Sequence, residues 1–266
     1  MKDVIKSTFN QIKKRKRLVI SIFLIQVILF LSIFLTGITF QVLGINEARQ
    51  VIEPLQNSDI SPDNLDAANE LAKNFEGISK SYKAMWKYMR YSIYIPFMIF
   101  ILLNGIIWVM THSLKRKVNF NEKSKQWLRF AGINLIVFLP YFLLADWYIS
   151  RIFTADVEVN NFVRNLWIIG YAFIPLYYIA VSGFALIGKS WKKMCKQFYE
   201  KAIKKIYVTL PIAVVLHGLI AGSGYILFLT LDKEVPNLLS VFSAGALFFA
   251  IILITRLIWI NYMQNE

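Results

Sequence analysis

The sequence is short of the residues on which most metal and redox sites depend. Its 266 residues include one cysteine and two histidines. The single cysteine, Cys195, excludes an internal disulfide, and no Cys or His spacing matches a zinc or haem site. No HExxH, Walker or GxSxG motif occurs in the chain,. We therefore expect no cofactor, no metal and no enzymatic activity.

Acidic residues are also scarce, and charge of either sign avoids the apolar parts of the chain. Asp and Glu number 16 against 30 Lys and Arg, which gives a formal net charge of +14. No Asp, Glu, Lys or Arg lies at the centre of an apolar block. This argues against a proton pump, a carrier built on carboxylates and an intramembrane aspartyl protease. A lipid-modifying enzyme would need an acid, base or metal cluster at the interface, and none is evident.

Apolar residues dominate the sequence, at 57% of the chain. They gather in blocks of about twenty residues, the length that spans a bilayer core as helix. The blocks predict an all-α, polytopic membrane protein with six transmembrane helices in three hairpins, and residues 1–266 form one membrane domain. The six expected spans are Leu18–Phe40, Ser92–Met110, Phe130–Ile149, Leu166–Gly188, Tyr207–Leu229 and Leu238–Ile260.

The basic residues predict the orientation of these spans. Seven Lys or Arg precede the first span, six lie between the second and third, and seven lie between the fourth and fifth. The two short loops on the opposite side hold three between them. By the positive-inside rule, both termini are cytoplasmic in a cell membrane. The charge then serves topology and attraction to anionic inner-leaflet lipids, and no nucleic-acid role is expected.

One long polar loop, residues 41–91, separates the first two spans on the outer side. Ser61 and Pro62 suit a helix start. After them, apolar residues recur every seven positions, which is typical of a helix packed along another helix. A shorter upstream stripe, Ile45 to Leu55, would be its partner. We expect a helical hairpin that forms a stalk, with a lid over the bundle or disorder as alternatives. The stalk residues expected to contact a partner are Leu65, Phe75, Tyr82 and Trp86.

Residues 189–206 form a second distinctive segment. Its apolar residues fall on one helical face and its lysines on the other, as in a helix that lies on a membrane surface. Its representative residues are Trp191 and Phe198 on the apolar face and Lys192 and Lys204 on the basic face. The alternative is a coupling helix that docks onto a cytoplasmic ATPase.

The remaining candidates are polar or small residues inside the spans. His217 is central among them, because a neutral imidazole in hydrocarbon needs a hydrogen-bond partner. Gly218 and Gly222 could let another helix approach closely. The other candidates are Ser223, Asn104, Asn134, Tyr141 and Tyr177. They are expected to act as packing contacts between helices or to line a polar cavity around His217.

Two functions fit these features. The first is a non-enzymatic scaffold or assembly component that binds a membrane or extracytoplasmic protein through its outer stalk. The second is a transport component, either a permease that works with a cytoplasmic ATPase or a small-solute channel, with a polar path around His217. Six spans, cytoplasmic termini and this length resemble the permease subunits of some ATP-driven exporters, in topology alone.

Overall fold

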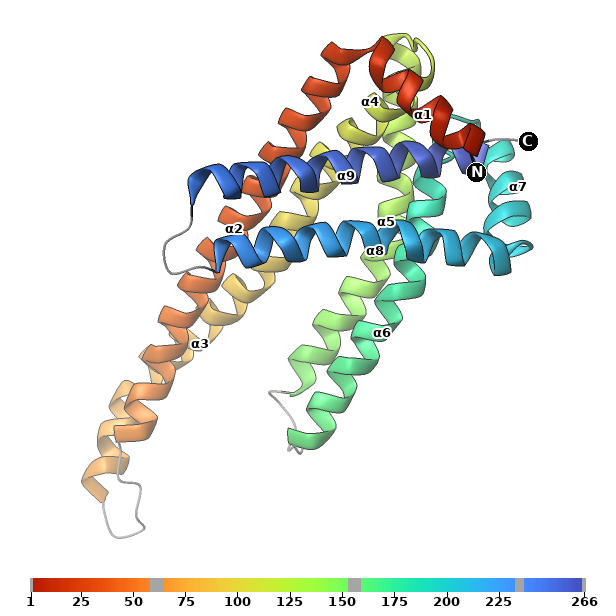
Figure 1. The fold of residues 1–266 in the computed structure, drawn as a ribbon. Coiled ribbons are helices and arrows are strands. Elements are labelled where there is room, and N and C mark those ends of the chain that lie inside the picture. Colours follow the sequence, from red (N-terminus) through yellow and green to blue (C-terminus); the bar gives the residue numbers. More distant parts are fainter. Residues whose placement is uncertain (1, 58–64, 153–158, 233–236, 265–266) are drawn as a thin grey trace. The chain divides into compact units, whose positions relative to one another are not determined.

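The computed structural model describes all residues except 1, 58–64, 153–158, 233–236 and 265–266. The described residues form helices joined by turns (Figure 1). In chain order the helices are α1 (Lys2–Lys14), α2 (Lys16–Asn57), α3 (Leu65–Ile99), η1 (Phe100–Asn104), α4 (Gly105–Lys115), α5 (Phe120–Ile152), α6 (Val159–Phe184), α7 (Trp191–Phe198), η2 (Tyr199–Ile203), α8 (Ile206–Leu231) and α9 (Leu238–Gln264). The segments η1 and η2 are π-helical turns.

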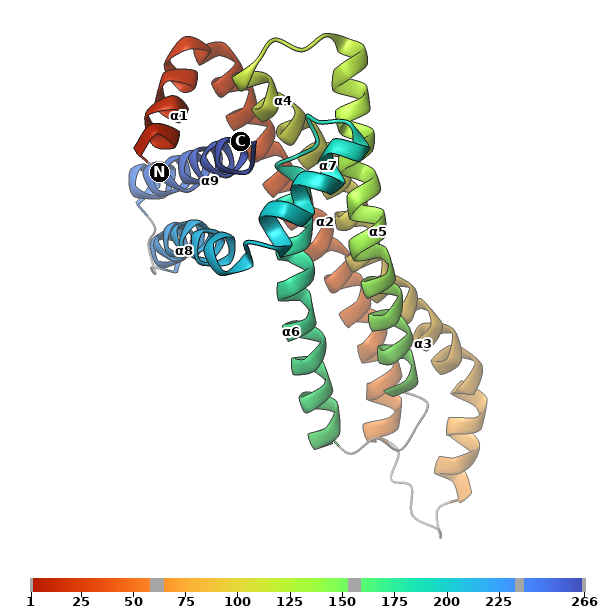
Figure 2. The ribbon, with the colours of Figure 1, turned by 90° about the vertical axis from the view of Figure 1, so that its right-hand side faces the viewer.

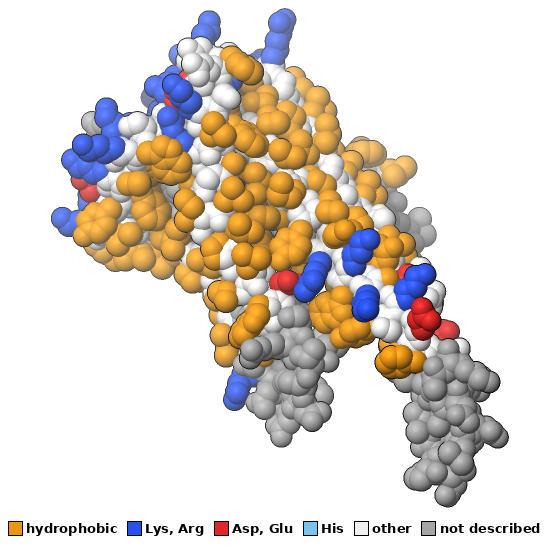
Figure 3. Space-filling model, turned by 180° about the vertical axis from the view of Figure 1, so that it is seen from behind, with side chains coloured by type: hydrophobic (Ala, Val, Ile, Leu, Met, Phe, Trp, Pro, Cys, Tyr) orange, Lys and Arg blue, Asp and Glu red, His pale blue; other side chains and the backbone are white. Residues whose placement is uncertain are grey.

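Five helical segments in the described part of the chain are long and apolar enough to cross a membrane. They are Lys16–Pro54, Asn74–Lys115, Phe120–Tyr148, Ile206–Leu231 and Leu238–Gln264. A shorter apolar stretch, Gly170–Phe184, lies in α6. Large apolar side chains cover much of the face drawn in Figure 3. Among the large apolar side chains of the described residues, Ile136 is exposed over 71% of its surface and Leu144 over 65%. The molecule therefore has the features of a multi-pass helical membrane protein.

The chain divides into two compact units, one formed by Met1–Val27 with Ile101–Glu266 and the other by Ile28–Phe100. The second unit is a helical hairpin of α2 and α3. Phe40 packs edge-to-face on Tyr91 with ring centroids 5.6 Å apart, and Ser81 donates to Oε1 of Gln50 at 2.8 Å. The two contacts are ten residues apart on each arm, in opposite directions. The arms therefore run antiparallel in constant register for about 15 Å.

The contact face of α3 differs in detail from the predicted stripe. A Cβ on Gly44 of α2 would lie 3.8 Å from Cβ of Tyr88, and Ser81 is buried. Phe75, by contrast, is 70% exposed. Positions 81 and 88 are themselves seven residues apart, and the predicted residues Tyr82 and Trp86 beside them are half-buried. Ser61, Pro62 and the side chain of Leu65 lie outside the described residues.

Both arms are continuous helices at the points where the predicted insertion begins and ends. α2 runs through residue 41 and α3 runs through residue 91 without a break. Pro54 and Pro96 lie inside these helices. The stalk hypothesis requires such unbroken arms, and its function stays a prediction.

In the first unit, α5 pairs with α6 and α8 pairs with α9 (Figures 1 and 2). Figure 2 shows α8 and α9 nearly end-on where α5 and α6 run lengthwise, so the two pairs cross steeply. The sequence predicts each of these pairs as a transmembrane hairpin, and the crossing of the two pairs is not part of that prediction. The connection from α6 to α8 explains the difference, because α7, η2 and a turn at Lys204 redirect the chain.

The predicted amphipathic helix over residues 189–206 is therefore interrupted. Only α7 is regular, and η2 follows it directly. Met194 and Ala202 are buried, whereas Trp191 and Ile203 are about half exposed, at 46% and 51%. Phe198 is half-buried, and Lys192 and Lys204 are exposed. Trp191 packs against Gly132 of α5, so one side of this segment contacts the rest of the protein.

Candidate functional site

The guanidinium of Arg256 occupies the centre of a polar cluster between helices of the first unit. Its Nη2 donates to Oδ1 of Asn104 at 2.9 Å. Its Cζ lies 5.5 Å from the centroid of the Trp108 ring, within the range of a cation–π contact,. Asn104 and Trp108 are almost fully buried. Helix α9 thus carries a cation into the space beside η1 and α4.

The π turn places Asn104 toward this cation. Pro96 cannot donate a backbone hydrogen bond, and its ring crowds the carbonyl four residues earlier. Five residues wound as η1 follow shortly after it. A π turn inserts one residue into a helix and so rotates the side chains that follow it. The result is that Asn104, at the last position of η1, lies against α9.

The absence of a side chain at Gly105 lets Trp127 pack against the same π turn. A Cβ at this position would lie 2.7 Å from Nε1 of Trp127. The Trp127 indole instead passes over the glycine and donates to the carbonyl of Leu102, within η1, at 3.3 Å. The π turn frees carbonyl oxygens from the regular ladder, and Trp127 satisfies one of them.

Two further polar side chains come from α6 and α8. Tyr177 of α6 is close enough to Arg256 for an electrostatic interaction between phenol and guanidinium. The Tyr177 ring meets the imidazole of His217 edge-to-face, with centroids 5.1 Å apart. Nδ1 of His217 donates to the carbonyl of Ala213 in its own helix at 2.7 Å, which leaves Nε2 as an acceptor,. Asn104 and Arg256 therefore form one contacting pair and Tyr177 and His217 another, and the electrostatic interaction of Arg256 with Tyr177 relates the two pairs.

The charge of this cluster is not balanced within the described residues. The described ion pairs, Arg129–Glu122 and Lys196–Glu200, do not include Arg256. Nη1 of Arg256 is buried and has no hydrogen-bond partner there. Because Arg256 lies in a segment apolar enough to cross a membrane, an uncompensated charge at this position is energetically expensive.

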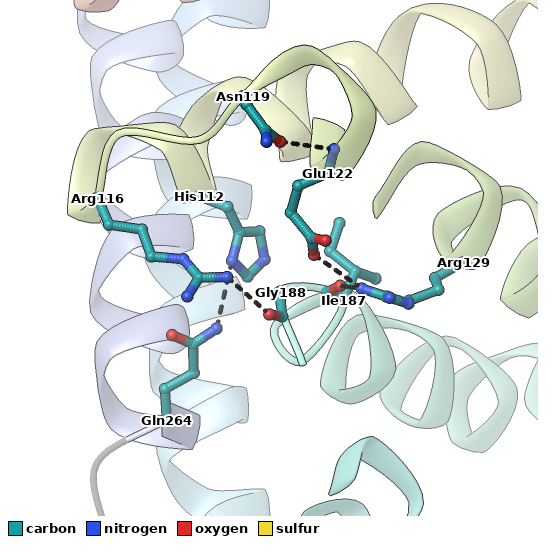
Figure 4. A network of polar contacts seen from close by, with 8 residues as sticks. All are labelled: His112, Arg116, Asn119, Glu122, Arg129, Ile187, Gly188 and Gln264. Carbon is teal, nitrogen blue, oxygen red and sulfur yellow. Dashed lines mark hydrogen bonds and ion pairs between the residues drawn. The ribbon is translucent and has the colours of Figure 1, made fainter. Parts of the chain in front are cut away.

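A second group of polar contacts lies at the C-terminal end of α6. Nε2 of His112 lies 3.0 Å from the carbonyl oxygen of Phe184, and His112 is buried. The amide of Gln264 donates to Nδ1 of His112 at 3.2 Å and to the carbonyl of Ala185 at 2.9 Å. The Nδ1 atom is thus the acceptor and Nε2 carries the proton. Figure 4 shows these side chains converging on the end of α6.

Basic side chains extend this group of contacts (Figure 4). Arg129 donates to the carbonyl of Ile187 at 2.9 Å and pairs with Glu122 at 3.3 Å. Arg116 donates to the carbonyl of Gly188 at 3.2 Å. Ile187 and Gly188 lie in the turn that follows α6, and a charged donor forms a strong hydrogen bond with a carbonyl there,. Some of the basic residues that predict topology therefore also hold the turn that follows α6.

The two groups are joined because α4 and α9 lie side by side. Asn104 contacts Arg256, and His112 contacts Gln264. Each pair of positions is separated by eight residues on its own helix, so α4 and α9 advance in the same direction over about 12 Å. Trp259 of α9 also bonds to α6, donating to the carbonyl of Val181 at 3.2 Å.

The other predicted residues lie outside the cluster or make local contacts. Ser223 and Asn134 are buried, and each hydrogen-bonds to a carbonyl of its own helix. Tyr141 packs on the ring of Phe173 at 5.6 Å. Nothing lies within 4 Å of a Cβ placed on Gly218 or Gly222. No helix of the described chain therefore makes the close approach expected at these glycines.

Sequence reasoning missed Arg256 and His112. Both lie near the predicted ends of spans, where a long or polar side chain can reach water. The signal that could have found Arg256 is Asn104, a mid-span amide that needs a partner. The partner is 152 residues away in the sequence.

No protein-family model, no curated protein and no solved structure matches the chain.

Proposed function

We propose that the protein is a membrane transport component that binds an anionic solute at Arg256. The observation that carries this proposal is the guanidinium itself, which lies in an apolar segment with a buried, unpartnered Nη1 and no described carboxylate beside it. An ionisable group at such a position is the strongest pointer to function that a membrane protein offers.

The surroundings of Arg256 suit a small anion that also carries a hydroxyl or protonated group. Asn104 and Trp108 hold the guanidinium in one orientation, so that its free N–H groups are preorganised,. The hydroxyl of Tyr177 can donate a further hydrogen bond, and Nε2 of His217 can accept one. A carboxylate or phosphate would supply the missing counter-charge, since the guanidinium fork matches both.

This proposal makes Arg256, instead of His217, the central residue of the transport hypothesis. The sequence places His217 at the heart of the polar path and ranks the scaffold function first. The contacts of Arg256 favour the transport function and make His217 a peripheral member of its site.

The test is anion-dependent stabilisation of the purified, detergent-solubilised chain. Chloride, inorganic phosphate, sulfate and short carboxylates are titrated while the unfolding temperature is followed. A ligand that binds only the folded state at a hundred times its Kd stabilises that state by about 2.7 kcal/mol. We expect at least one anion to raise the Tm of the wild type, Arg256→Lys to keep part of this effect and Arg256→Gln to abolish it.

The matched control is Arg164→Gln, because Arg164 is an exposed arginine of α6 that makes no part of the cluster. It should respond to anions like the wild type. The proposal would be contradicted if no anion raised the Tm of the wild type. It would also be contradicted if an anion raised the Tm of the wild type and of Arg256→Gln equally. An active anion is then tested for flux in proteoliposomes.

A second function, partner binding by the α2–α3 hairpin, rests on a separate observation. Its exposed apolar side chains include Ile45, Ile52 and Phe75, at 54%, 47% and 70% exposure. A photocrosslinking residue at position 75 should form one discrete adduct in native membranes, and one at Arg164 should not. Loss of that adduct on Ile52→Ser would support a partner surface, and crosslinking to lipid alone would oppose it.

A further inference from the structure

Helix α1 presents three different faces. One face packs on α9, where Val4 and Thr8 are buried and Oγ1 of Thr8 accepts a hydrogen bond from Asn261 at 3.0 Å. A second face carries Ile5 and Phe9, which are 39% and 48% exposed. An exposed apolar face beside basic residues is typical of a helix that lies in a membrane surface.

The third face of α1 lines a pocket together with the end of α4. The pocket has a volume of about 560 Å³. All of its lining residues except Leu114 are polar or charged. The lining consists of Asp3, Lys6, Ser7, Asn10, Gln11, Lys14, Arg15, Leu114 and Lys115. The α1 members recur at helical spacing, which is why a single short helix can supply most of one wall.

The pocket is strongly basic. Lys6, Lys14, Arg15 and Lys115 face one carboxylate, that of Asp3. None of the three lysines takes part in a described ion pair. Lys115 also feels the repulsion of Lys189, Lys201 and Arg116 nearby. Figure 3 shows Lys and Arg side chains gathered at the end of the molecule where Figure 1 places α1 and α7.

One of the four cations is fixed in place. Nη1 of Arg15 donates to the carbonyl of Ser113, near the end of α4. This contact ties the junction between α1 and α2 to α4, so the two walls of the pocket hold a defined separation. The lysines need no such contact, since an ammonium on a long stem can turn toward a charge that enters.

We propose that this pocket binds the phosphate of an anionic phospholipid. A phosphate supplies the negative charge that the lysines lack, and the neighbouring Ile5 and Phe9 face can lie against the acyl chains of the same leaflet. Basic pockets between helices at a membrane surface bind such headgroups. The proposal goes beyond the general attraction of basic loops to lipid and is independent of the anion site at Arg256.

The test is lipid retention and titration with the purified full-length chain in detergent micelles. The probes are phosphatidylglycerol, phosphatidylcholine and inorganic phosphate, followed by native mass spectrometry and by the shift in Tm. The wild type should retain phosphatidylglycerol and not phosphatidylcholine. Each lysine beside an anionic headgroup is worth roughly fivefold in affinity, so Lys14→Gln with Lys115→Gln should weaken the apparent Kd about 25-fold.

The matched control is Lys192→Gln with Lys193→Gln, which removes the same charge from exposed positions on α7. It should change the apparent Kd by less than about threefold. An equal loss in both double variants would mean non-specific attraction and would overturn the proposal. An equal response to inorganic phosphate would make the ligand a free phosphate and not a lipid. If the first double variant fails to fold, Lys6→Gln alone should still weaken binding about fivefold.

Discussion

A methyl group on Gly105 would lie 2.7 Å from Nε1 of Trp127. The indole crosses the backbone of the π turn at this position and donates to Leu102. Phe130, fully buried, borders the same space with Cδ1 2.9 Å from the added methyl group. The side chains around Gly105 therefore leave no room for any other residue.

Gly105→Ala should destabilise the folded chain. The added methyl group must displace Trp127 or Phe130, and such overpacking costs about 1–3 kcal/mol. The measurement is thermal unfolding of the detergent-solubilised chain. Gly77→Ala is the control, because nothing lies within 4 Å of a Cβ there and alanine favours helix by about 1 kcal/mol,. Equal responses of the two variants would contradict the tight packing at Gly105.

Replacing Arg256 and Asn104 together with apolar residues should leave the chain as stable as the wild type or more stable. A buried charge without a carboxylate partner carries a desolvation penalty that one amide does not offset, and apolar replacements of buried charges are often neutral or stabilising by about 1–4 kcal/mol. The variant is Arg256→Met with Asn104→Leu, compared by thermal unfolding. A large loss of stability would mean that the pair is structural, which would weaken the case for a binding site.

His112 and Gln264 should be energetically coupled. Removing either leaves a carbonyl of the α6 end without its donor, at a cost of about 1–3 kcal/mol each. In a double-mutant cycle with His112→Ala and Gln264→Ala, we expect an interaction energy of about 0.5–3 kcal/mol. His217→Ala serves as the comparison, because His217 bonds within its own helix. Additive losses at His112 and Gln264 would argue against their direct contact.

Arg129→Met should lower stability more than Arg164→Met. The Arg129 side chain is 12% exposed, pairs with Glu122 and caps the carbonyl of Ile187. Hydrogen bonds to charged groups contribute about 1.5–3 kcal/mol when they are shielded from water. Arg164 is exposed, and its loss should cost less than about 0.5 kcal/mol,. The readout is again the Tm of each purified variant, and indistinguishable values would remove the capping role.

The sequence was sufficient for the helical class and for most apolar segments, because hydropathy over twenty residues is a local property. It also singled out Asn104, Tyr177 and His217 as polar residues in apolar surroundings. It could not join them, since Arg256 meets Asn104, and His217 meets Tyr177, only through the packing of helices distant in sequence. A charge near the end of a span is ambiguous until its neighbours are known.

The sequence pattern of the α2–α3 hairpin likewise leaves part of its packing undetermined. Seven-residue spacing predicted that α3 packs on a helix, and α2 is that helix. Adjacent stripes of such a pattern have similar composition, so the spacing does not identify which one meets the partner. Ser81 lies in the contact because Gln50 opposes it, and that pairing is a property of both arms. The steep crossing of the α8–α9 pair likewise depends on turns that hydropathy does not describe.

The end of α6 also sets an order of events during synthesis. Arg116, Arg129 and His112 precede α6 in the sequence, so they are synthesised before the carbonyls that they contact at the end of α6 and in the turn after it. Gln264 follows Ala185 by 79 residues. At about 5–20 residues per second, the ribosome takes roughly 4–16 s to cover that distance. During this interval only side chains from earlier helices contact the end of α6 and its following turn. The hydrogen bond from Gln264 in the last turn of α9 forms afterwards. A residue in the last turn of α9 thus completes a group of contacts that α4 and α5 begin.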